Sequence, residues 1–357
     1  MQHPGHDEIE VSVFGRGIGE SAAIHVGNGR WIVIDSFKNG ENLPVAEAYL
    51  SSIGVSARAV EAILLTHWHD DHISGAADLV KAAPNAIVAL PITLENDEFL
   101  AFLEKSHPSE GQFSSGVNEL RDIMGLLLER GCSPRWSFAE KRIAGGPAQL
   151  FELEALSPSD EQVTQFLRSL PDWLEQHAVG GRLVRPDRND TSVASVVRIG
   201  SKKLLFGADL ETRTRASGWQ HVHSNSWKER GEAQFFKIPH HGSETGHYEP
   251  VWRDMLEANV CAVLTPWNKS STLPTEADVA RILSFTNRAF AASKPVARET
   301  LKRMALVEGI IRQKGIKLSL GSEDVGQARF RRSISGQDDW QVEFFGTGAT
   351  HLADIAA

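Results

Sequence analysis

The chain opens with short runs in which apolar and polar residues alternate, a pattern typical of strands with one buried face. Residues 8–15 form the first run, and residues 22–36 form a second that turns back at Asn28-Gly29, a dipeptide favoured in tight hairpin turns. Gly15, Gly17 and Gly19 alternate between the two runs. No amphipathic helix follows these glycines, so we predict a hairpin loop near a pocket rather than a dinucleotide-binding turn.

Helical and extended patterns then follow one another. Residues 42–60 are predicted to be helical, and residues 59–66 form an apolar strand that runs directly into a polar cluster. A second helix is predicted over residues 74–83 and a further strand over 86–91. Strands that alternate with helices indicate a layered α/β architecture.

The hydrophobic pattern changes after the first 95 residues. Residues 95–185 carry helical periodicity broken by Ser-, Pro- and Gly-rich joints, and from Thr191 the strand pattern returns. We predict one domain over residues 1–357, with an α-rich insertion at about 95–185 and a helical plus hairpin C-terminal part at about 275–350. The predicted later segments are strands at 191–199, 203–210, 235–242 and 259–266, helices at 275–293 and 295–315, and a closing hairpin over 328–346.

Composition narrows the class of protein. The 357 residues are 41% hydrophobic and 23% charged, as in a globular protein, and two cysteines exclude a disulfide framework. No apolar run reaches the length of a membrane span and no secretory signal is visible, so the expectation is a cytoplasmic protein without a membrane partner. The net charge of −9 argues against a protein that grips long nucleic acid with its whole surface. Positive charge for a phosphate substrate would have to be local, and a bound metal ion could supply it.

The densest chemistry lies directly after the strand at 59–66. His67, His69, Asp71 and His72 form the pattern His-x-His-x-Asp-His. In an extended segment, residues two apart point the same way, so His67 and His69 can bind one metal ion. After a turn of the chain, Asp71 and His72 can face a second ion. Imidazole and carboxylate ligands suit a borderline cation such as Zn²⁺.

Two further groups follow apolar strands in the same way. Asp209 ends the strand that contains Leu204–Phe206, and His240-His241 follow the strand that begins at Phe235. A carboxylate at the end of a buried strand is costly unless it is paired or bound to metal. Because ligands collect at the carboxyl ends of strands in layered α/β folds, we expect these groups to join the His67–His72 cluster.

These residues together resemble the metallo-β-lactamase-fold hydrolases, which implies a four-layer αββα sandwich. The likeness implies that Asp35 follows the family's early strand, that Asp209 bridges the metals, and that the last ligand lies in His240-His241. The closest likeness is to the ComEC-type branch, the hydrolase domain of DNA-uptake proteins. It rests on three motifs: Gly17–Ser21, Asn189–Ser192 and Lys237–Ser243.

The resemblance implies a set of roles. Two divalent cations, zinc first and manganese as the alternative, would hold a bridging hydroxide as the nucleophile. The metal set is His67, His69, Asp71, His72, Asp209, His240 and His241, with Asp71 and His240 as the catalytic pair. His241 is favoured over His240 as the ligand, and the reverse assignment stays open. Asp35 would orient a ligand histidine or serve as a turn residue.

The third ligand of the first metal is also left open. Asn189 stands where many family members have a histidine, and it is a weaker ligand than imidazole. The first metal ion is therefore bound weakly, bound with a remote histidine as its third ligand, or bound only when substrate is present. The remote candidates are His177, His221, His223 and His247.

The expected function is metal-dependent hydrolysis of a phosphodiester. The partner would be a phosphate-containing substrate such as single-stranded nucleic acid, a nucleotide or a phospho-headgroup. His69 favours hydrolysis over redox chemistry, because the di-iron relatives typically carry Glu there. Hydrolysis of a lactone, thioester or carboxylic ester on the same site is one alternative, and a non-catalytic metal-binding interaction module is another. Trp219, Trp227 and Trp267 either pack in the core or line the mouth of the site.

Overall fold

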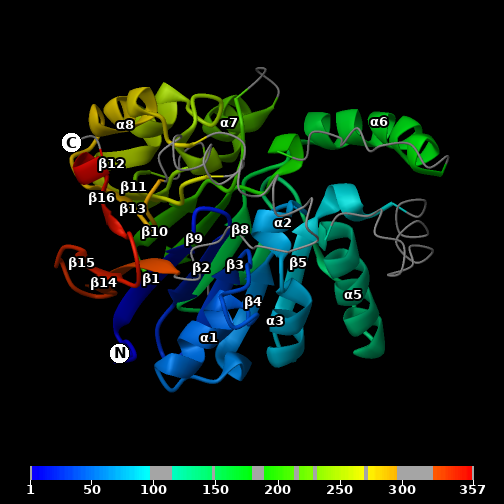
Figure 1. The fold of residues 1–357 in the computed structure, drawn as a ribbon, viewed down its shortest axis with the longest axis horizontal. Helices are drawn as coiled ribbons and strands as arrows, with labels where there is room; N and C mark the ends of the chain where they lie inside the picture. Colours follow the sequence, from blue (N-terminus) through cyan, green and yellow to red (C-terminus); the bar gives the residue numbers. More distant parts are fainter. Residues whose placement is uncertain are drawn as a thin grey trace, which may run out of the picture.

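Strands that alternate in sequence with helices build two facing sheets in this computed structural model (Figure 1). The structure describes residues 2–96, 115–146, 149–178, 189–212, 217–227, 231–268, 272–295 and 325–355. Within these ranges each sheet has eight strands. The first has the order β15 (Gln341–Phe345), β14 (Gly326–Ser333), β1 (Glu8–Gly15), β2 (Glu20–His25), β3 (Trp31–Ile34), β4 (Val60–Leu64), β5 (Ile87–Pro91), β6 (Arg135–Ser137).

The second sheet mixes parallel and antiparallel pairs. Its order is β16 (Thr350–His351), β13 (Ala289–Ala291), β12 (Leu256–Leu264), β11 (Ala233–Lys237), β10 (Lys202–Phe206), β9 (Ser195–Ile199), β8 (Phe151–Ala155), β7 (Arg142–Gly145). At the centre of the two sheets, β3 runs parallel to β4 and β10 runs parallel to β11. The carboxyl ends of each parallel pair therefore open at one edge of its sheet.

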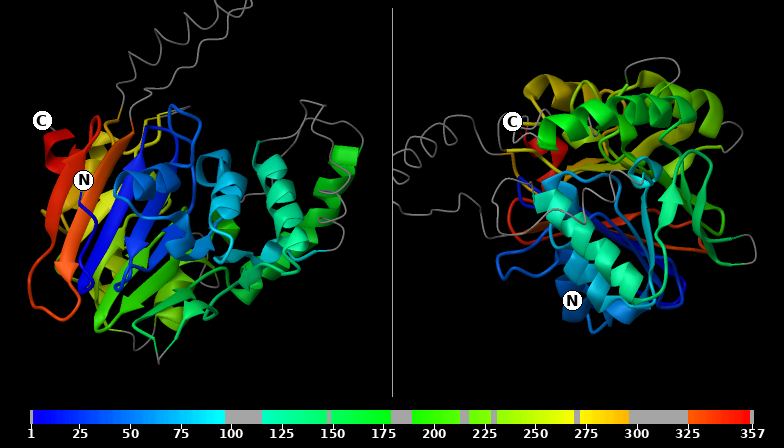
Figure 2. Two further views of the ribbon diagram at one scale, coloured as in Figure 1. Left: turned by 90° about the horizontal axis from the view of Figure 1, so that it is seen from below. Right: turned by 90° about the vertical axis from the view of Figure 1, so that its right-hand side faces the viewer.

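Helices cover the outer face of both sheets. Figures 1 and 2 show α1 and α3 on the first sheet, with α5 packed beside α3, and α7 and α8 on the second sheet. Their bounds are α1 (Val45–Ser52), α3 (Ala76–Ala82), α5 (Ser115–Glu129), α7 (Gly218–His221) and α8 (Glu276–Leu283). A long helix, α6 (Asp160–Ala178), contributes Phe166 and Leu170 to the same core as α5. Two π-helical turns, η5 (Val222–Ser226) and η7 (Val251–Met255), complete the cover of the second sheet.

Three buried clusters lie between these four layers. Along β3 and β4, Val33 and Ile63 face the helices while Ile32 and Leu64 face the second sheet. Both faces of these strands are buried, which explains why they appear as continuous apolar runs in the sequence. The third cluster packs the second sheet against α7, η7 and α8. The expected αββα sandwich is confirmed.

The predicted α-rich insertion needs correction. Between α5 and α6 the chain supplies β6, β7 and β8, which complete the edges of both sheets, so this part of residues 95–185 belongs to the core. Periodicity missed β6 and β7 because they have only three and four residues. The helix predicted over 42–60 is shorter: Pro44 precedes it, and Gly54 follows it with a φ of 76°. The closing hairpin is confirmed as β14 and β15.

The helix predicted over 275–293 is wrong at its end, because only Glu276–Leu283 is helical and Ala289–Ala291 forms β13. Other predicted segments are not tested. The structure does not describe residues 97–114 and 179–188 of the predicted insertion. Nearly all of the helix predicted over 295–315 also lies outside the described residues. Among the described helices, none combines the length and apolar character that a bilayer span requires.

His25 on β2 gives the fold a pH dependence. Its Nδ1 donates to the Glu8 carbonyl at 2.8 Å, and its Nε2 accepts from the Gly29 amide at 3.0 Å, an arrangement that requires a neutral ring. Burial is the main cause that lowers the pKa of His25 to about 4. The unfolded chain, with an ordinary His pKa of about 6.5, then binds more protons between these pH values. Stability from this residue is complete above pH 6.5 and is lost as the pH falls toward 4.

We expect the wild-type chain to lose up to about 3 kcal/mol relative to His25→Gln between pH 7 and pH 4. Glutamine keeps an uncharged donor and acceptor at this position, and every other titrating group is common to both proteins. Urea unfolding of both proteins at each pH measures the difference. A gap between the two that does not change with pH would contradict this role of His25.

Candidate metal centre

The predicted histidines and aspartates meet where the central strands of both sheets end. Asp35 follows β3, the segment His67–His72 follows β4, Asp209 follows β10, and His240-His241 follow β11. The parallel pairing within each sheet carries these ends to the same edge (Figure 1). The predicted convergence therefore occurs in the structure.

Four buried side chains form the first group, which we call cluster A: Asp71, His72, Asp209 and His241. One ligand atom from each lies within 4.8 Å of the others. His72 Nε2 is 3.3 Å from Asp71 Oδ2 and 3.5 Å from Asp209 Oδ1. His241 Nε2 is 3.6 Å from Asp71 Oδ2 and 3.7 Å from Asp209 Oδ2. Two imidazole nitrogens and two carboxylates thus face one point.

A second group, cluster B, consists of His67, His69 and Asp209. His67 Nε2 lies 2.9 Å from His69 Nδ1 and 3.9 Å from Asp209 Oδ2. His67 and Asp209 are buried, while His69 is half-buried. Asp209 is shared by both clusters, which is the arrangement needed for a carboxylate that bridges two ions.

The residues present fit a pair of divalent cations. His72 Nε2 and Asp209 Oδ1 are buried, and neither has a hydrogen-bond partner within the described chain. An unsatisfied buried polar atom costs about 1–3 kcal/mol, so two of them at one point call for an external partner. Nitrogen and carboxylate donors are those of zinc and manganese sites.

Electrostatics at the clusters favours charged carboxylates. Burial alone would raise the pKa of Asp209, but the neighbouring His72 and His241 hold it well below its usual range. Burial would lower the pKa of His72, yet Asp209, Asp71 and Asp35 raise it well above its usual value. His67 differs, because burial followed by repulsion from His72 and His69 lowers its pKa far below the usual value. The centre therefore presents ionised carboxylates at neutral pH.

Hydrogen bonds fix which imidazole nitrogen faces each cluster. His72 Nδ1 donates to Asp35 Oδ2 at 2.8 Å, and Asp35 also accepts from the amide and hydroxyl of Thr66, both at 2.8 Å. His241 Nδ1 donates to the Thr265 carbonyl at 2.9 Å. Both rings consequently present Nε2 to cluster A, as orienting partners do in metal sites. This is the orienting place that the resemblance implied for Asp35.

The backbone around the centre is strained. Asp35, Ala208, His240 and His241 have φ values of 58°, 46°, 47° and 55°, in the left-handed region. Each such non-glycine residue costs about 1–3 kcal/mol. Strain of this kind concentrates at sites where side-chain placement matters.

His240 lies outside both clusters. Its Nδ1 is 3.2 Å from Glu211 Oε1 and 2.8 Å from Thr245 Oγ1, and its Nε2 is 3.3 Å from Asn189 Nδ2. The structure thus places His241, not His240, among the prospective metal ligands. Asn189 donates to Glu211 at 3.1 Å, and its buried Oδ1 has no hydrogen-bond partner within the described chain.

Three of the four remote histidines, those with described side chains, do not join the centre. His223 pairs with Asp254 at 2.8 Å, His221 lies beside Asn225, and His247 packs against Phe285. The side chain of His177 lies outside the described part of the molecule.

Sequence reasoning missed two supports of the centre. Glu211 stands two residues after Asp209, a spacing that could have identified it as a second carboxylate on the same side. Lys237 and Glu20 are buried and meet at 2.7 Å between Nζ and Oε2, so two of the quoted motifs join behind the centre. Nothing in either motif alone shows that their side chains pair across the sheets.

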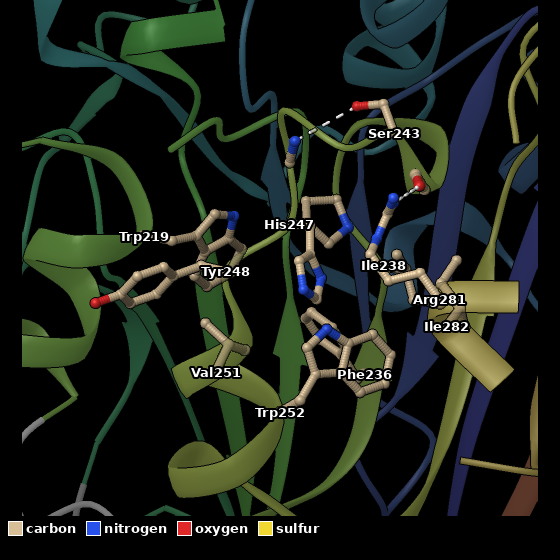
Figure 3. Close-up of a pocket in the computed structure, with 13 residues that line it drawn as sticks. Trp219, Phe236, Ile238, Ser243, His247, Tyr248, Val251, Trp252, Arg281 and Ile282 are labelled. Atoms are coloured by element: carbon tan, nitrogen blue, oxygen red, sulfur yellow. Dashed lines mark hydrogen bonds between the residues drawn. The ribbon is translucent and has the colours of Figure 1, made fainter. Parts of the chain in front are cut away.

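The tryptophans divide between core and mouth. Trp219 and Trp227 are buried, whereas Trp267 is half-buried and lies against His241 with 5.3 Å between ring centroids. Trp219 instead lines a small pocket behind the His240–Gly242 turn (Figure 3). The cavity of this pocket has about 10 Å³, room for about one water molecule. This pocket is therefore too small to take a substrate.

Comparison with known proteins finds a family match over part of the chain. The model of the metallo-beta-lactamase superfamily matches residues 15–122, which include Asp35 and the His67–His72 segment. Hydroxyacylglutathione hydrolase 2 from Vibrio vulnificus strain YJ016 is 62% identical over 32 residues, 9% of this chain and 13% of that protein. The match thus spans about an eighth of the curated relative.

Solved metallo-beta-lactamases are similar at low identity. MIM-2 is 14% identical with a TM-score of 0.32, over 60% of this chain and 61% of that one. MEM-A1, a subclass B3 enzyme from a soil metagenome library, is 14% identical with a TM-score of 0.36, over 68% of this chain and 80% of that one.

Proposed function

We propose that this chain, which carries a match to the metallo-beta-lactamase superfamily on an αββα fold, is a metal-dependent hydrolase that cleaves a phosphodiester. The observation that carries the proposal is Asp209, which is shared by two clusters of buried nitrogen and oxygen ligands. A fold-only role would not require His72 Nε2 and Asp209 Oδ1 to be buried at the same point without a hydrogen bond to any described residue.

The residues of clusters A and B would bind the metal ions and orient the attacking water. Cluster A would hold one cation and cluster B the other, with Asp209 common to both. Divalent cations bound there supply an acidified water and neutralise charge that develops on the scissile group. Asp71 faces both His72 and His241 through Oδ2, and that carboxylate would orient the attacking water.

His240 would exchange a proton with the substrate. Glu211 and Thr245 hold its Nδ1, which leaves Nε2 as the atom that faces the amide of Asn189. The side chain is one-fifth exposed, unlike the buried His241. In the present contact Nε2 accepts from the Asn189 amide. Once that amide has turned to the substrate, an Nε2 that carries a proton would give it to a leaving-group oxygen beside it, as a positioned general acid does.

The preference for a phosphodiester rests on residues from three motifs that resemble the ComEC-type branch. Glu20 and Lys237 pair behind the centre, and Asn189 lies beside His240. An amide donor beside an imidazole suits anionic oxygen atoms. The acidic net charge of −9 favours short or single-stranded substrates over a long duplex.

Hydrolysis of a thioester is the second candidate. It is favoured by the 32-residue similarity to a hydroxyacylglutathione hydrolase, a protein whose name denotes a thioester substrate. Both candidates use the same clusters, and they differ in the group that His240 and Asn189 would face.

The proposal predicts metal-dependent cleavage of bis-p-nitrophenyl phosphate. We expect turnover with added Mn²⁺ or Zn²⁺ to exceed that of a chelated sample by at least about a hundredfold, because the acidified water is lost with the metal. An S-acylglutathione and a lactone, tested under the same conditions, separate the candidates. Metal-dependent turnover of only the thioester or lactone would overturn the phosphodiester assignment, and no metal-dependent turnover of any of the three would count against hydrolysis itself.

A further inference from the structure

The turn that carries the histidines after β11 is held in an unfavourable conformation. His240, His241 and Gly242 are consecutive, and their φ values are 47°, 55° and 82°. A left-handed turn costs about 1–2 kcal/mol for each residue with a Cβ atom. Contacts from outside the turn must therefore oppose its relaxation, because relaxation would move His241 Nε2 away from cluster A.

Contacts close to the turn hold its beginning. The His240 amide donates to the Ala208 carbonyl at 2.9 Å, and the Gly242 amide donates to the Pro239 carbonyl at 3.0 Å. A Cβ atom on Gly242 would meet Leu264 Cδ2 at 3.0 Å, so the backbone also packs closely against β12. These contacts leave the Gly242 carbonyl to be fixed from elsewhere.

Arg281 on α8 supplies that contact. Its Nη2 donates to the Gly242 carbonyl at 2.7 Å (Figure 3). Its Nη1 lies 2.7 Å from Asp278 Oδ1. Asp278 is itself fixed, since it forms a capping box with Thr275 at the start of α8. The guanidinium is thus anchored at one end and reaches the turn with the other.

We propose that Arg281 is a positioning residue for cluster A, which keeps His241 Nε2 directed at Asp71 and Asp209 by fixing the Gly242 carbonyl. The inference rests on the proposed metal centre. Arg281 approaches the turn from the small pocket behind it, whose cavity of about 10 Å³ is too small for a substrate. Its contact with the turn, rather than contact with a ligand in that pocket, is therefore its role.

Metal binding by the apoprotein tests this role without reference to any substrate. Co²⁺ titration followed by visible absorption reports the ligand geometry, and Zn²⁺ competition with a chelating dye gives the affinity. The variants are Arg281→Met, which removes both polar contacts, and Arg281→Lys, which keeps the charge. Arg288→Met is the matched control. Arg288 directly precedes β13 and pairs with Asp339, away from the turn.

We expect Arg281→Met to bind the more tightly held of the two metal ions about 10–100-fold more weakly than wild type, as for other residues that orient ligands. Its Co²⁺ spectrum should also be altered. Arg281→Lys should fall between wild type and Arg281→Met, and Arg288→Met should match wild type. Circular dichroism at the titration temperature verifies that each variant is folded. A purely structural role would lower the melting temperature and leave the spectrum and affinity of the folded protein unchanged.

Two failures are distinguishable. Wild-type protein that takes up no metal would refute the proposed function and this inference together. Metal-binding wild type with an Arg281→Met variant of equal affinity and spectrum would overturn only the role of Arg281. Where Arg281→Met does not fold, Arg281→Lys decides, and unchanged affinity in that variant overturns the inference.

Discussion

Replacing Asp209 by Asn is expected to lower kcat/KM for the true substrate by about a thousandfold or more. Asp209 is the side chain common to both clusters, and its two oxygens lie within 4 Å of His67, His72 and His241. An amide of the same shape removes the negative charge that two neighbouring cations need. The loss should therefore appear in metal content as well as in turnover.

The control is Asp254→Asn. Asp254 also pairs with a histidine, His223, but on the exposed surface of η7. We expect this variant to retain wild-type turnover and metal content. Elemental analysis after dialysis, steady-state kinetics and circular dichroism are the measurements. A folded Asp209→Asn protein with two bound metal ions and full activity would refute the shared-ligand role.

Much of this centre could be predicted because its residues are placed by simple geometry. The segment after β4 concentrates three histidines in six residues, and a strand end directs them to one edge of the sheet. Asp209 could be found for the same reason, as a carboxylate that ends a buried strand is costly alone. The four layers followed from apolar strands that alternate with helices.

The parts that could not be predicted depend on backbone angles and distant pairings. Whether His240 or His241 faces cluster A is decided by two left-handed residues, which no spacing rule specifies. Short edge strands such as β6 owe their structure to the neighbouring strand rather than to their own pattern. The contacts of Glu211 and Asn189 with each other and with His240 depend on the folded chain, so their place beside the centre could not be predicted.

Loss of the Lys237 charge should destabilise the protein more than loss of any exposed cation. Lys237 on β11 and Glu20 on β2 connect the two sheets through the interior, where both are buried. Thr265 also donates to Glu20, and Lys237 Nζ donates to the Ile238 carbonyl at 3.1 Å. Without the ammonium, the Glu20 carboxylate would be left buried close to Asp35.

We expect Lys237→Met to cost about 3–5 kcal/mol, the usual effect of removing one partner of a buried ion pair. Replacing both partners, as Glu20→Gln with Lys237→Met, should recover most of that loss, because no uncompensated charge then remains in the interior. Lys38→Met is the control: its ion pair with Asp78 is partly exposed, and its loss should cost at most about 1 kcal/mol. Urea unfolding of the four proteins measures the differences, and a Lys237→Met variant no less stable than Lys38→Met would show that the pair between the sheets contributes little.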